Sequence, residues 1–305
     1  MWTKLKKLQN VDDYNKFLDS FETFLFDCDG VLWHGNTLLP RTRETLDLLK
    51  KRGKRIIFVT NNSSKSRKSY KKKLESHEIP AEEDEIFGSA YAAAVYLKQV
   101  VKFPSEQKVY VVGEEGIEAE LDAEGIAHCG GTDPNDRQPM TAEDFETFDQ
   151  DPSIGAVLCG IDFHFNYLKL CKAFTYLQNS KTLFLLTNDD STYPSHGKKF
   201  PGAGSISSSL TFSTGRTPKS LGKPYSTMMD CIEAKLKFDK EKAVFIGDRL
   251  DTDILFAKNS NIKSLLVLTG VSTEREILAD DAKILPDFYI NQIGDLYQVD
   301  DKGNV

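Results

Sequence analysis

The sequence predicts an α/β protein with a doubly wound parallel sheet, and three observations carry this prediction. The apolar runs Phe24–Asp27 and Arg55–Thr60 are typical of strands buried on both faces. A helical pattern, Arg41–Arg52, lies between them, and strand–helix–strand order requires parallel pairing. The same pattern returns near the C-terminus, at Ala243–Gly247 and Ser264–Leu268.

The first third of the chain supplies the opening elements of this sheet. Val11–Ser20 is an amphipathic lead-in helix, and Gly53 ends the helix Arg41–Arg52. A polar loop and a second helical pattern follow the strand at Thr60. The basic stretch Lys65–Lys73 fits one side of that helix, so we interpret it as a solvated face rather than a nucleic-acid contact.

The middle of the chain carries a second α/β pattern, which we interpret as an inserted domain. Its predicted strands and helices are Lys108–Val112, Ile117–Ala123, Ala156–Cys159, Tyr167–Leu177, Thr182–Leu186 and Ser205–Phe212. Two stretches rich in breakers, Gly130–Pro139 and Tyr193–Gly204, predict loops. We therefore expect a discontinuous core of residues 1–100 and 219–305, interrupted by an inserted domain of residues 101–218.

The last third completes the core. The strand Ala243–Gly247 ends in Asp248, and Thr273 with Glu276 forms a capping-box signature that starts a helix. A last short strand is expected at Phe288–Ile290.

Composition excludes several classes of protein. With 305 residues and a net charge of −7, a surface for nucleic acid is not expected. Five cysteines without a Cys-x-x-Cys pair imply neither a disulfide framework nor a zinc site. No run approaches the roughly 18 apolar residues of a membrane span, and the N-terminal residues lack a secretory apolar core. We expect a soluble cytoplasmic protein, with access to the nucleus left open.

Two carboxylates end the first strand. Strands disfavour aspartate, yet Asp27 and Asp29 stand where this strand stops, and Gly30 then allows a tight turn. The carboxyl ends of parallel strands face the crevice where open α/β sheets bind ligands. Taken alone, Asp-x-Asp-Gly is more typical of a strand followed by an Asp-rich turn, so the other strand ends must decide.

Polar residues recur at the other ends of the core segments. They are Thr60, Asn61 and Asn62, then Lys223, then Asp248, Asp251 and Asp253. Taken alone, Gly222-Lys223-Pro224 is typical of a surface turn, and the last group of an acidic helix N-terminus. A doubly wound sheet brings such ends together at one edge, so the complete set predicts a site. The Lys223 segment lacks the spacing of a nucleotide-binding loop.

With these motifs in place, the chain resembles the phosphatases of the haloacid dehalogenase (HAD) superfamily. The matching motifs are Asp27-x-Asp29-Gly30-Val31-Leu32-Trp33, Thr60-Asn61-Asn62-Ser63, Lys223 and Gly247-Asp248-Arg249-Leu250-x-Thr252-Asp253. Within the superfamily it resembles the 4-nitrophenylphosphatase group, which includes phosphoglycolate and pyridoxal phosphate phosphatases, and its fungal members most of all. The resemblance covers about residues 21–298 and implies a C2-type cap for the inserted domain.

The resemblance implies roles for the strand-end residues. Asp27 would be the nucleophile that forms an aspartyl-phosphate, and Asp29 the general acid and base. Mg²⁺ would be held by Asp27, the backbone carbonyl of Asp29, and Asp248, with Asp253 supporting the metal site. Thr60, Asn61, Asn62 and Lys223 would bind the phosphate.

The resemblance also implies a substrate loop in the cap, at about Asp189–Pro194. Tyr193 stands where pyridoxal phosphate phosphatases carry a histidine, which puts pyridoxal phosphate in doubt as the main substrate; Tyr193 is also compatible with an ordinary loop aromatic. The implied activity is Mg²⁺-dependent hydrolysis of small phosphomonoesters, 4-nitrophenyl phosphate in vitro and phosphoglycolate-like acids in vivo. A phosphoprotein phosphatase, a pyridoxal phosphate phosphatase and a catalytically silent binding protein remain alternatives. A homodimer is compatible with the family.

Overall fold

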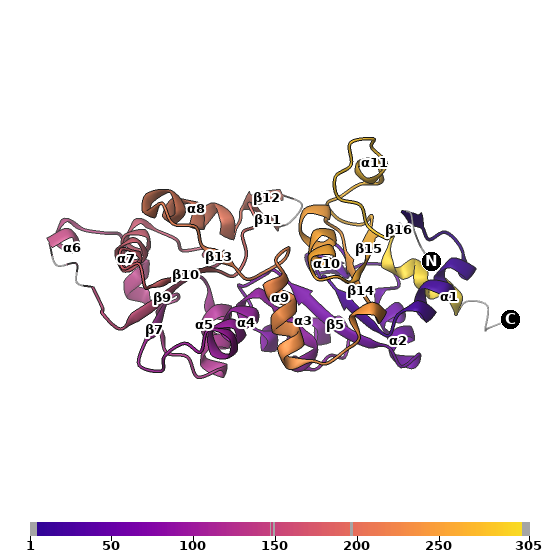
Figure 1. Cartoon of the computed structure of the whole chain (residues 1–305), viewed down its shortest axis with the longest axis horizontal. Helices are drawn as coiled ribbons and strands as arrows, with labels where there is room; N and C mark the ends of the chain where they lie inside the picture. The colour runs from indigo at the N-terminus through magenta and orange to yellow at the C-terminus, as the bar shows by residue number, and fades with distance from the viewer. Residues whose placement is uncertain (1–4, 147, 149, 196–197, 301–305) are drawn as a thin grey trace. The chain divides into compact units, whose positions relative to one another are not determined.

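The chain divides into two compact units, each of which draws on separate parts of the sequence (Figure 1). Our computed structural model describes residues 5–146, 148, 150–195 and 198–300. Unit 1 comprises Met1–Thr60, Lys71–Phe87 and Lys223–Val305, and unit 2 comprises Asn61–Tyr70 and Gly88–Gly222. Residues 61–70 and 88–100 thus group with the inserted segment. The domain boundaries expected from the sequence stay a prediction.

Unit 1 is built on a seven-stranded sheet. In spatial order its strands are β1 (Lys6–Lys7), β16 (Phe288–Ile290), β15 (Lys263–Val267), β14 (Ala243–Gly247), β2 (Thr23–Phe26), β5 (Arg55–Thr60) and β6 (Ile86–Gly88). Every neighbouring pair from β1 to β5 runs parallel. The first strand therefore lies in the middle of the sheet, and the predicted α/β doubly wound fold is confirmed.

Helices cover both faces of this sheet. They are α1 (Val11–Ser20), α2 (Thr42–Lys51), α3 (Arg67–Ser76, which begins in unit 2), α9 (Ser226–Lys235), α10 (Leu255–Asn259) and α11 (Glu274–Ile277). On one face, Phe17 of α1 packs edge-on against Phe24 and Phe288 at centroid distances of 6.1 and 5.3 Å. On the other face, Phe245 packs against Phe256 of α10 at 5.1 Å. Both faces of the central strands are thereby removed from water.

Unit 2 holds a five-stranded parallel sheet. Its spatial order is β13 (Lys219–Ser220), β10 (Leu183–Leu186), β9 (Ile154–Cys159), β7 (Lys108–Val112) and β8 (His128–Gly130). Its helices are α4 (Ser89–Val95), α5 (Glu115–Ala123), α6 (Ala142–Glu146), α7 (Tyr167–Leu177) and α8 (Ala203–Thr214).

The two faces of this second sheet bury separate apolar clusters. Val109 and Val111 of β7 point into a cluster with α4 and α5, whereas Tyr110 and Val112 point into a cluster with α7 and α8. Figure 1 shows these two helix pairs on opposite sides of the sheet. The alternation has the period of two expected of a strand buried on both faces.

Short turns and hairpins complete the chain. The helical turns are η1 (Glu83–Glu85), η2 (Tyr96–Val100), η3 (Pro134–Arg137), η4 (Lys240–Lys242), η5 (Leu250–Ile254) and η6 (Ile293–Val299). Two antiparallel hairpins pair β3 (Trp33–His34) with β4 (Thr37–Leu38), and β11 (Thr192–Ser195) with β12 (Lys198–Pro201).

The second hairpin corrects one prediction from the sequence. The block Tyr193–Gly204 was expected to be a loop because of its glycines and prolines, but most of it forms β11, β12 and the start of α8. Tyr193 pairs with Phe200 across the two strands of the hairpin. The local number of glycines and prolines gives no information about such a pairing.

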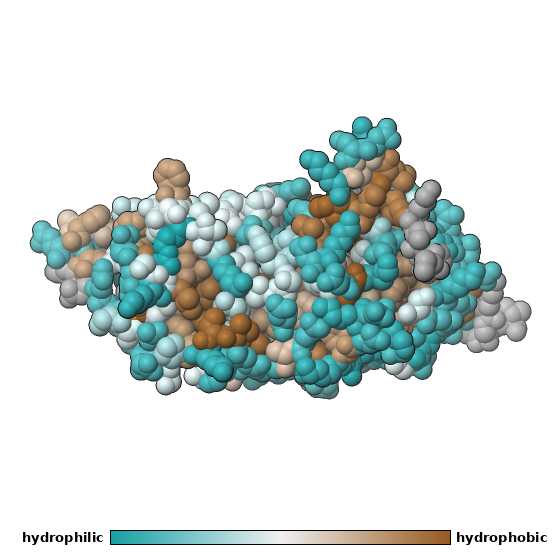
Figure 2. All heavy atoms as spheres, viewed as in Figure 1, coloured by the Kyte–Doolittle hydropathy of each residue, from teal (hydrophilic) through white to brown (hydrophobic). Residues whose placement is uncertain are grey.

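Exposed apolar side chains gather near α11 in unit 1. Val271, Leu278 and Leu285 are 47%, 60% and 38% exposed, and Figure 2 shows apolar spheres around α11. Among the described residues, none of the helices is long and apolar enough to cross a membrane.

Replacing Phe245 by alanine should destabilise unit 1. Its side chain is fully buried in β14, so we expect a loss of about 3–5 kcal/mol in the free energy of unfolding. Leu278→Ala, at an exposed position of the same unit, should stay within about 0.5 kcal/mol of wild type. Urea unfolding followed by circular dichroism measures both, and equal midpoints for the two variants would contradict the packing described above.

Candidate functional site

Lys223 joins two carboxylates beneath the carboxyl edge of the sheet in unit 1. Its ammonium nitrogen lies 2.6 Å from Asp27 Oδ1 and 2.8 Å from Asp253 Oδ1, and it donates to the carbonyl oxygen of Val59 at 3.2 Å. The side chain is only 2% exposed. Asp27 after β2, Val59 of β5 and Asp253 after β14 therefore meet at one buried cation, as expected of strand ends that share an edge. Lys223 itself follows β13 of the other sheet, so its expected place at the end of a core strand was wrong.

Both oxygens of the Asp253 carboxylate accept hydrogen bonds. While Oδ1 accepts from Lys223, Oδ2 accepts the backbone N–H groups of Asp248 and Arg249 at 3.0 and 3.1 Å. The carboxylate thus fixes the loop after β14 and at the same time positions the ammonium group. The supporting role at a metal site expected for Asp253 stays a prediction.

Asp248 lies against two glycines. Gly30 has a φ of +87°, and a Cβ atom at this position would lie 2.7 Å from Asp248 Oδ2. Gly270 leaves similar room, because a Cβ there would collide with the same carboxylate. The backbone N–H of Val271 donates to Asp248 Oδ2 at 2.7 Å. The predicted need for glycine at position 30 is confirmed, and its reason is both backbone conformation and close approach.

Asp29 occupies a different environment from Asp27. Its Oδ1 accepts the indole N–H of Trp33 at 2.8 Å and lies 3.7 Å from Lys73 Nζ, and its side chain is 41% exposed. Asp27, by contrast, is almost fully buried. Two carboxylates two residues apart therefore experience very different solvation, which is what opposite roles in acid–base chemistry require.

Lys73 corrects the interpretation of the basic stretch as a solvated face. Its side chain is 16% exposed, and its nitrogen lies 4.1 Å from the centre of the Trp33 ring as well as close to Asp29. Helical spacing could not distinguish this lysine from its solvated neighbours, because only the tertiary fold brings it to Trp33.

The surroundings of the cluster favour the uncharged forms of two of its carboxyl groups. Burial raises the pKa of Asp27 to about 7, with Asp253 and Asp29 acting in the same direction and Lys223 opposing them. Burial, Asp253 and Asp27 together raise the pKa of Asp248 to about 8. Burial would lower the pKa of Lys223, but the charges of Asp253 and Asp27 outweigh it and raise that pKa.

The donor set of this cluster fits a hard divalent cation. Asp27, Asp248 and Asp253 each place a carboxylate oxygen within 4.8 Å of the others. When all three are ionised, they share the ammonium group of Lys223 and the four groups sum to a charge of −2. Buried negative charge lined by oxygen atoms is what Mg²⁺ or Ca²⁺ would compensate.

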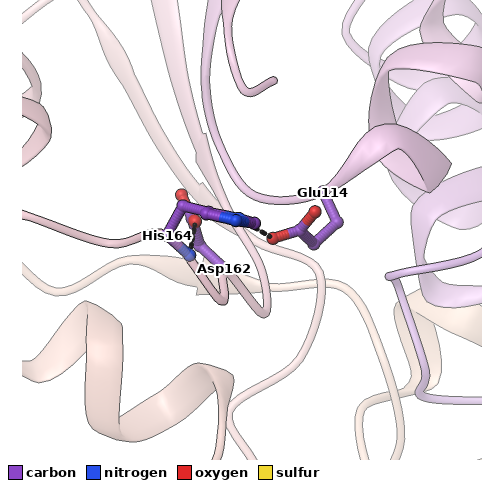
Figure 3. Close-up of side chains that lie close together, drawn as sticks. All are labelled: Glu114, Asp162 and His164. Carbon is purple, nitrogen blue, oxygen red and sulfur yellow. Dashed lines mark hydrogen bonds and ion pairs between the residues drawn. The ribbon is translucent and has the colours of Figure 1, made fainter. Parts of the chain in front are cut away.

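A second group of possible ligands lies in unit 2, and its charges are already balanced. Figure 3 shows Glu114, Asp162 and His164 side by side, with His164 Nδ1 3.3 Å from Glu114 Oε1. Asp162 forms an ion pair of 2.6 Å with the buried Lys169, and Glu114 lies 3.5 Å from Arg137. Each carboxylate thus has its own protein cation, so this group does not call for a metal ion.

Similarity to known proteins identifies the family of this chain. The model of the haloacid dehalogenase-like hydrolase family matches residues 24–127, and the HAD-hydrolase-like model matches residues 220–296. A 4-nitrophenylphosphatase from Schizosaccharomyces pombe is 56% identical, over 95% of this chain and 98% of that protein. The chain belongs to the haloacid dehalogenase-like hydrolases.

Two further proteins similar to this hydrolase are also named phosphatases. Phosphoglycolate phosphatase 1A of Arabidopsis thaliana is 44% identical, over 94% of this chain and 79% of that protein. A crystal structure of a 4-nitrophenylphosphatase from Thermotoga maritima superposes with a TM-score of 0.78 at 30% identity, covering 92% of this chain and 98% of that one. This HAD hydrolase is accordingly an enzyme of the phosphomonoester hydrolase class.

The expected phosphate-binding residues of the hydrolase fall on both sides of a unit boundary. Thr60 is the last residue of β5 in unit 1 and is 3% exposed, and Asn61 is the first residue assigned to unit 2. The Asn62 side-chain oxygen accepts from the backbone N–H and the hydroxyl of Ser64 at 2.9 and 2.7 Å, which shapes the loop locally. Binding of phosphate by these residues stays a prediction.

Tyr193 lies in β11 of unit 2, where its ring meets that of Phe163 edge-on at a centroid distance of 5.7 Å. Its expected contact with substrate also stays a prediction. The sequence places Asp190 in the expected substrate loop, Asp189–Pro194, but assigns it no role of its own. Asp190 binds Asn61 directly, at 2.8 Å, and only the fold joins two residues so far apart in the chain.

Replacing Asp248 by asparagine should stabilise this hydrolase at alkaline pH when divalent cations are chelated. Because the folded-state pKa is raised from 3.8 to about 8, the wild type binds more protons when folded and loses stability as the pH rises through this range. The asparagine can still accept from Val271 but carries no charge. Its advantage should grow from pH 4 to 8 and reach on the order of 2–5 kcal/mol.

Urea unfolding at several pH values, with a chelator, measures this difference. In excess Mg²⁺ the order should reverse, because cation binding stabilises the wild type by mass action. A variant less stable than wild type at pH 8 under chelation would show that Asp248 is not held under electrostatic strain.

Proposed function

We propose that this phosphatase hydrolyses small phosphomonoesters through an aspartyl-phosphate on Asp27, with Mg²⁺ as cofactor. The observation that carries the proposal is the buried cluster of Asp27, Lys223, Asp253 and Asp248 at the carboxyl edge of the unit 1 sheet. The 56% identity to a 4-nitrophenylphosphatase supports 4-nitrophenyl phosphate as a substrate in vitro.

Asp27 is oriented for nucleophilic attack. Lys223 binds its Oδ1 at 2.6 Å, so the carboxylate cannot rotate freely. In the first step a carboxylate oxygen of Asp27 attacks phosphorus, the bond from phosphorus to the ester oxygen breaks, and Asp29 gives its proton to the departing alkoxide. The products are the free alcohol and an aspartyl-phosphate.

The second step regenerates the enzyme. Asp29, now a carboxylate, takes a proton from water as the water oxygen attacks phosphorus. The bond between phosphorus and Asp27 breaks, inorganic phosphate leaves, and Asp27 returns to its carboxylate form. The partial exposure of Asp29 leaves its carboxylate accessible to the attacking water.

Three groups would hold the Mg²⁺ ion: the carboxylates of Asp27 and Asp248, and the backbone carbonyl of Asp29. When bound, the ion would neutralise the phosphate and the surrounding carboxylates. The excess negative charge of the cluster supports this assignment. Asp253 would keep Lys223 and the loop of Asp248 in place, and Thr60, Asn61, Asn62 and Lys223 would bind the phosphoryl oxygens.

We assign the choice of leaving group to unit 2, as the expected cap, and to Tyr193 within it. The relationship to a phosphoglycolate phosphatase at 44% identity supports a small phosphorylated acid as the physiological substrate. Tyrosine at position 193 in place of histidine argues against pyridoxal phosphate as the preferred substrate.

Phosphate release from a panel of phosphoesters tests the mechanism. The panel comprises phosphoglycolate, glycerol 3-phosphate, 4-nitrophenyl phosphate, pyridoxal phosphate and a phosphotyrosyl peptide. Wild type should release phosphate only with Mg²⁺, and Asp27→Asn should lower kcat at least about 1000-fold because it removes the nucleophile. Melting curves verify that the variant is folded.

The ranking of the panel decides among the alternatives. Preference for phosphoglycolate supports the proposal, and preference for the peptide would indicate a phosphoprotein phosphatase. Folded wild type that binds Mg²⁺ yet releases no phosphate from any compound would favour a binding protein.

Replacing Tyr193 by alanine should alter selectivity more than chemistry. We expect the ratio of kcat/KM for 4-nitrophenyl phosphate to kcat/KM for phosphoglycolate to change about 10-fold from wild type, because an aromatic contact is worth about 1 kcal/mol or more. Phe200→Ala, at the paired position of the same hairpin, is the matched control. Equal losses for both substrates in the Tyr193 variant would contradict a role in leaving-group selection.

A further inference from the structure

Asn61, which directly follows the strand end at Thr60, is bound by one carboxylate of unit 2. Its side-chain nitrogen donates to Asp190 Oδ2 at 2.8 Å, and Asn188 donates to the same oxygen at 2.7 Å. The backbone carbonyl of Asn61 accepts the hydroxyl of Ser89 at 2.7 Å. Both the backbone and the side chain of Asn61 are therefore tied to unit 2.

The charge of Asp190 fixes which way the Asn61 carboxamide points. An ionised carboxylate can only accept hydrogen bonds, so it selects the NH₂ end of each neighbouring amide and repels the oxygen end. The Asn61 oxygen is left on the side of Gly222, where a Cβ atom would lie 2.7 Å from it. A neutral amide at position 190 could donate as well as accept, and the orientation would no longer be determined.

The backbone of Asp190 connects this contact to the hairpin that carries Tyr193. Its carbonyl oxygen accepts the N–H of Gly204 at 2.9 Å, at the start of α8, and Ser191 accepts the N–H of Gly202 at 2.9 Å. The loop that enters β11 and the segment that leaves β12 are thus joined at Asp190.

We propose that Asp190 is a positioning residue for phosphate binding. Its carboxylate holds Asn61 as a hydrogen-bond donor and anchors the donor to the base of the β11–β12 hairpin. This inference rests on the proposed function, in which Asn61 binds the phosphoryl group. It assigns to the hairpin loop a role in turnover that is separate from contact with the leaving group.

Asp190→Asn tests the proposal, since it keeps the size of the side chain and removes the charge. We expect kcat/KM to fall about 10- to 100-fold for every active phosphoester, and the inhibition constant for inorganic phosphate to rise, because Asn61 acts on the group that all of them share. Asp122→Asn makes the same chemical change at an exposed carboxylate of unit 2 that accepts from His128 instead, and should stay within about 2-fold of wild type.

A double-mutant cycle separates positioning from general stability. In the Asn61→Ala background, Asp190→Asn should lower kcat/KM by less than about 2-fold, because the partner of Asp190 has already been removed. Two single-variant decreases in kcat/KM that multiply in the double variant would overturn the proposal. A decrease in the Asp190→Asn variant that is confined to one leaving group would also overturn it. So would Asp190→Asn with wild-type kcat/KM.

The failure of the proposed function would look different. In that case wild type would release no phosphate from the panel, whatever residue stands at position 190. Calorimetric titration with inorganic phosphate would still decide the role of Asp190: weaker binding by Asp190→Asn supports it, and unchanged binding overturns it. Melting curves of all variants exclude a global loss of fold.

Discussion

The site depends on one electrostatic constraint: three buried carboxylates lie close together, and the ammonium group of Lys223 forms described ion pairs with two of them. Lys223 touches Asp27 and Asp253 directly, and Asp253 in turn fixes the backbone beside Asp248. Burial of so much negative charge opposes folding, and the apolar packing on both faces of the sheet must offset it. The same strain favours the binding of a cation.

Charge balance, rather than residue type, separates the two acidic clusters found among the described residues. Glu114 and Asp162 each face a protein cation, and the buried pair of Asp162 and Lys169 is locally complete. Asp27, Asp248 and Asp253 have the same chemistry but only one neighbouring cation, Lys223. Burial, reinforced by mutual repulsion of the carboxylates, raises the pKa values of Asp27 and Asp248. A cluster that needs a further positive charge is a better candidate for metal binding than one that is already neutral.

The chain passes between the two units at two points next to residues proposed to bind phosphate. Thr60 is followed by Asn61, and Lys223 is preceded by Gly222, so residues proposed to bind phosphate are covalent neighbours of residues held by unit 2. Asn61 and Gly222 pack against each other within that unit.

The sequence by itself determined the parallel α/β architecture, because buried strands and intervening helices leave strong periodic patterns. Strands β5, β7, β14 and β16 have the bounds expected from those patterns. It also indicated that Asp27 and Asp248 would meet, since both follow strands of one parallel sheet. Lys223 follows β13 of the other sheet, so its place beside Asp27 was decided by the tertiary structure. The tertiary structure alone decided the burial of Lys73 against Trp33, the hairpin at Tyr193 and the bond between Asn61 and Asp190. These features depend on contacts between distant segments, and local periodicity carries no information about which side chains such contacts will join.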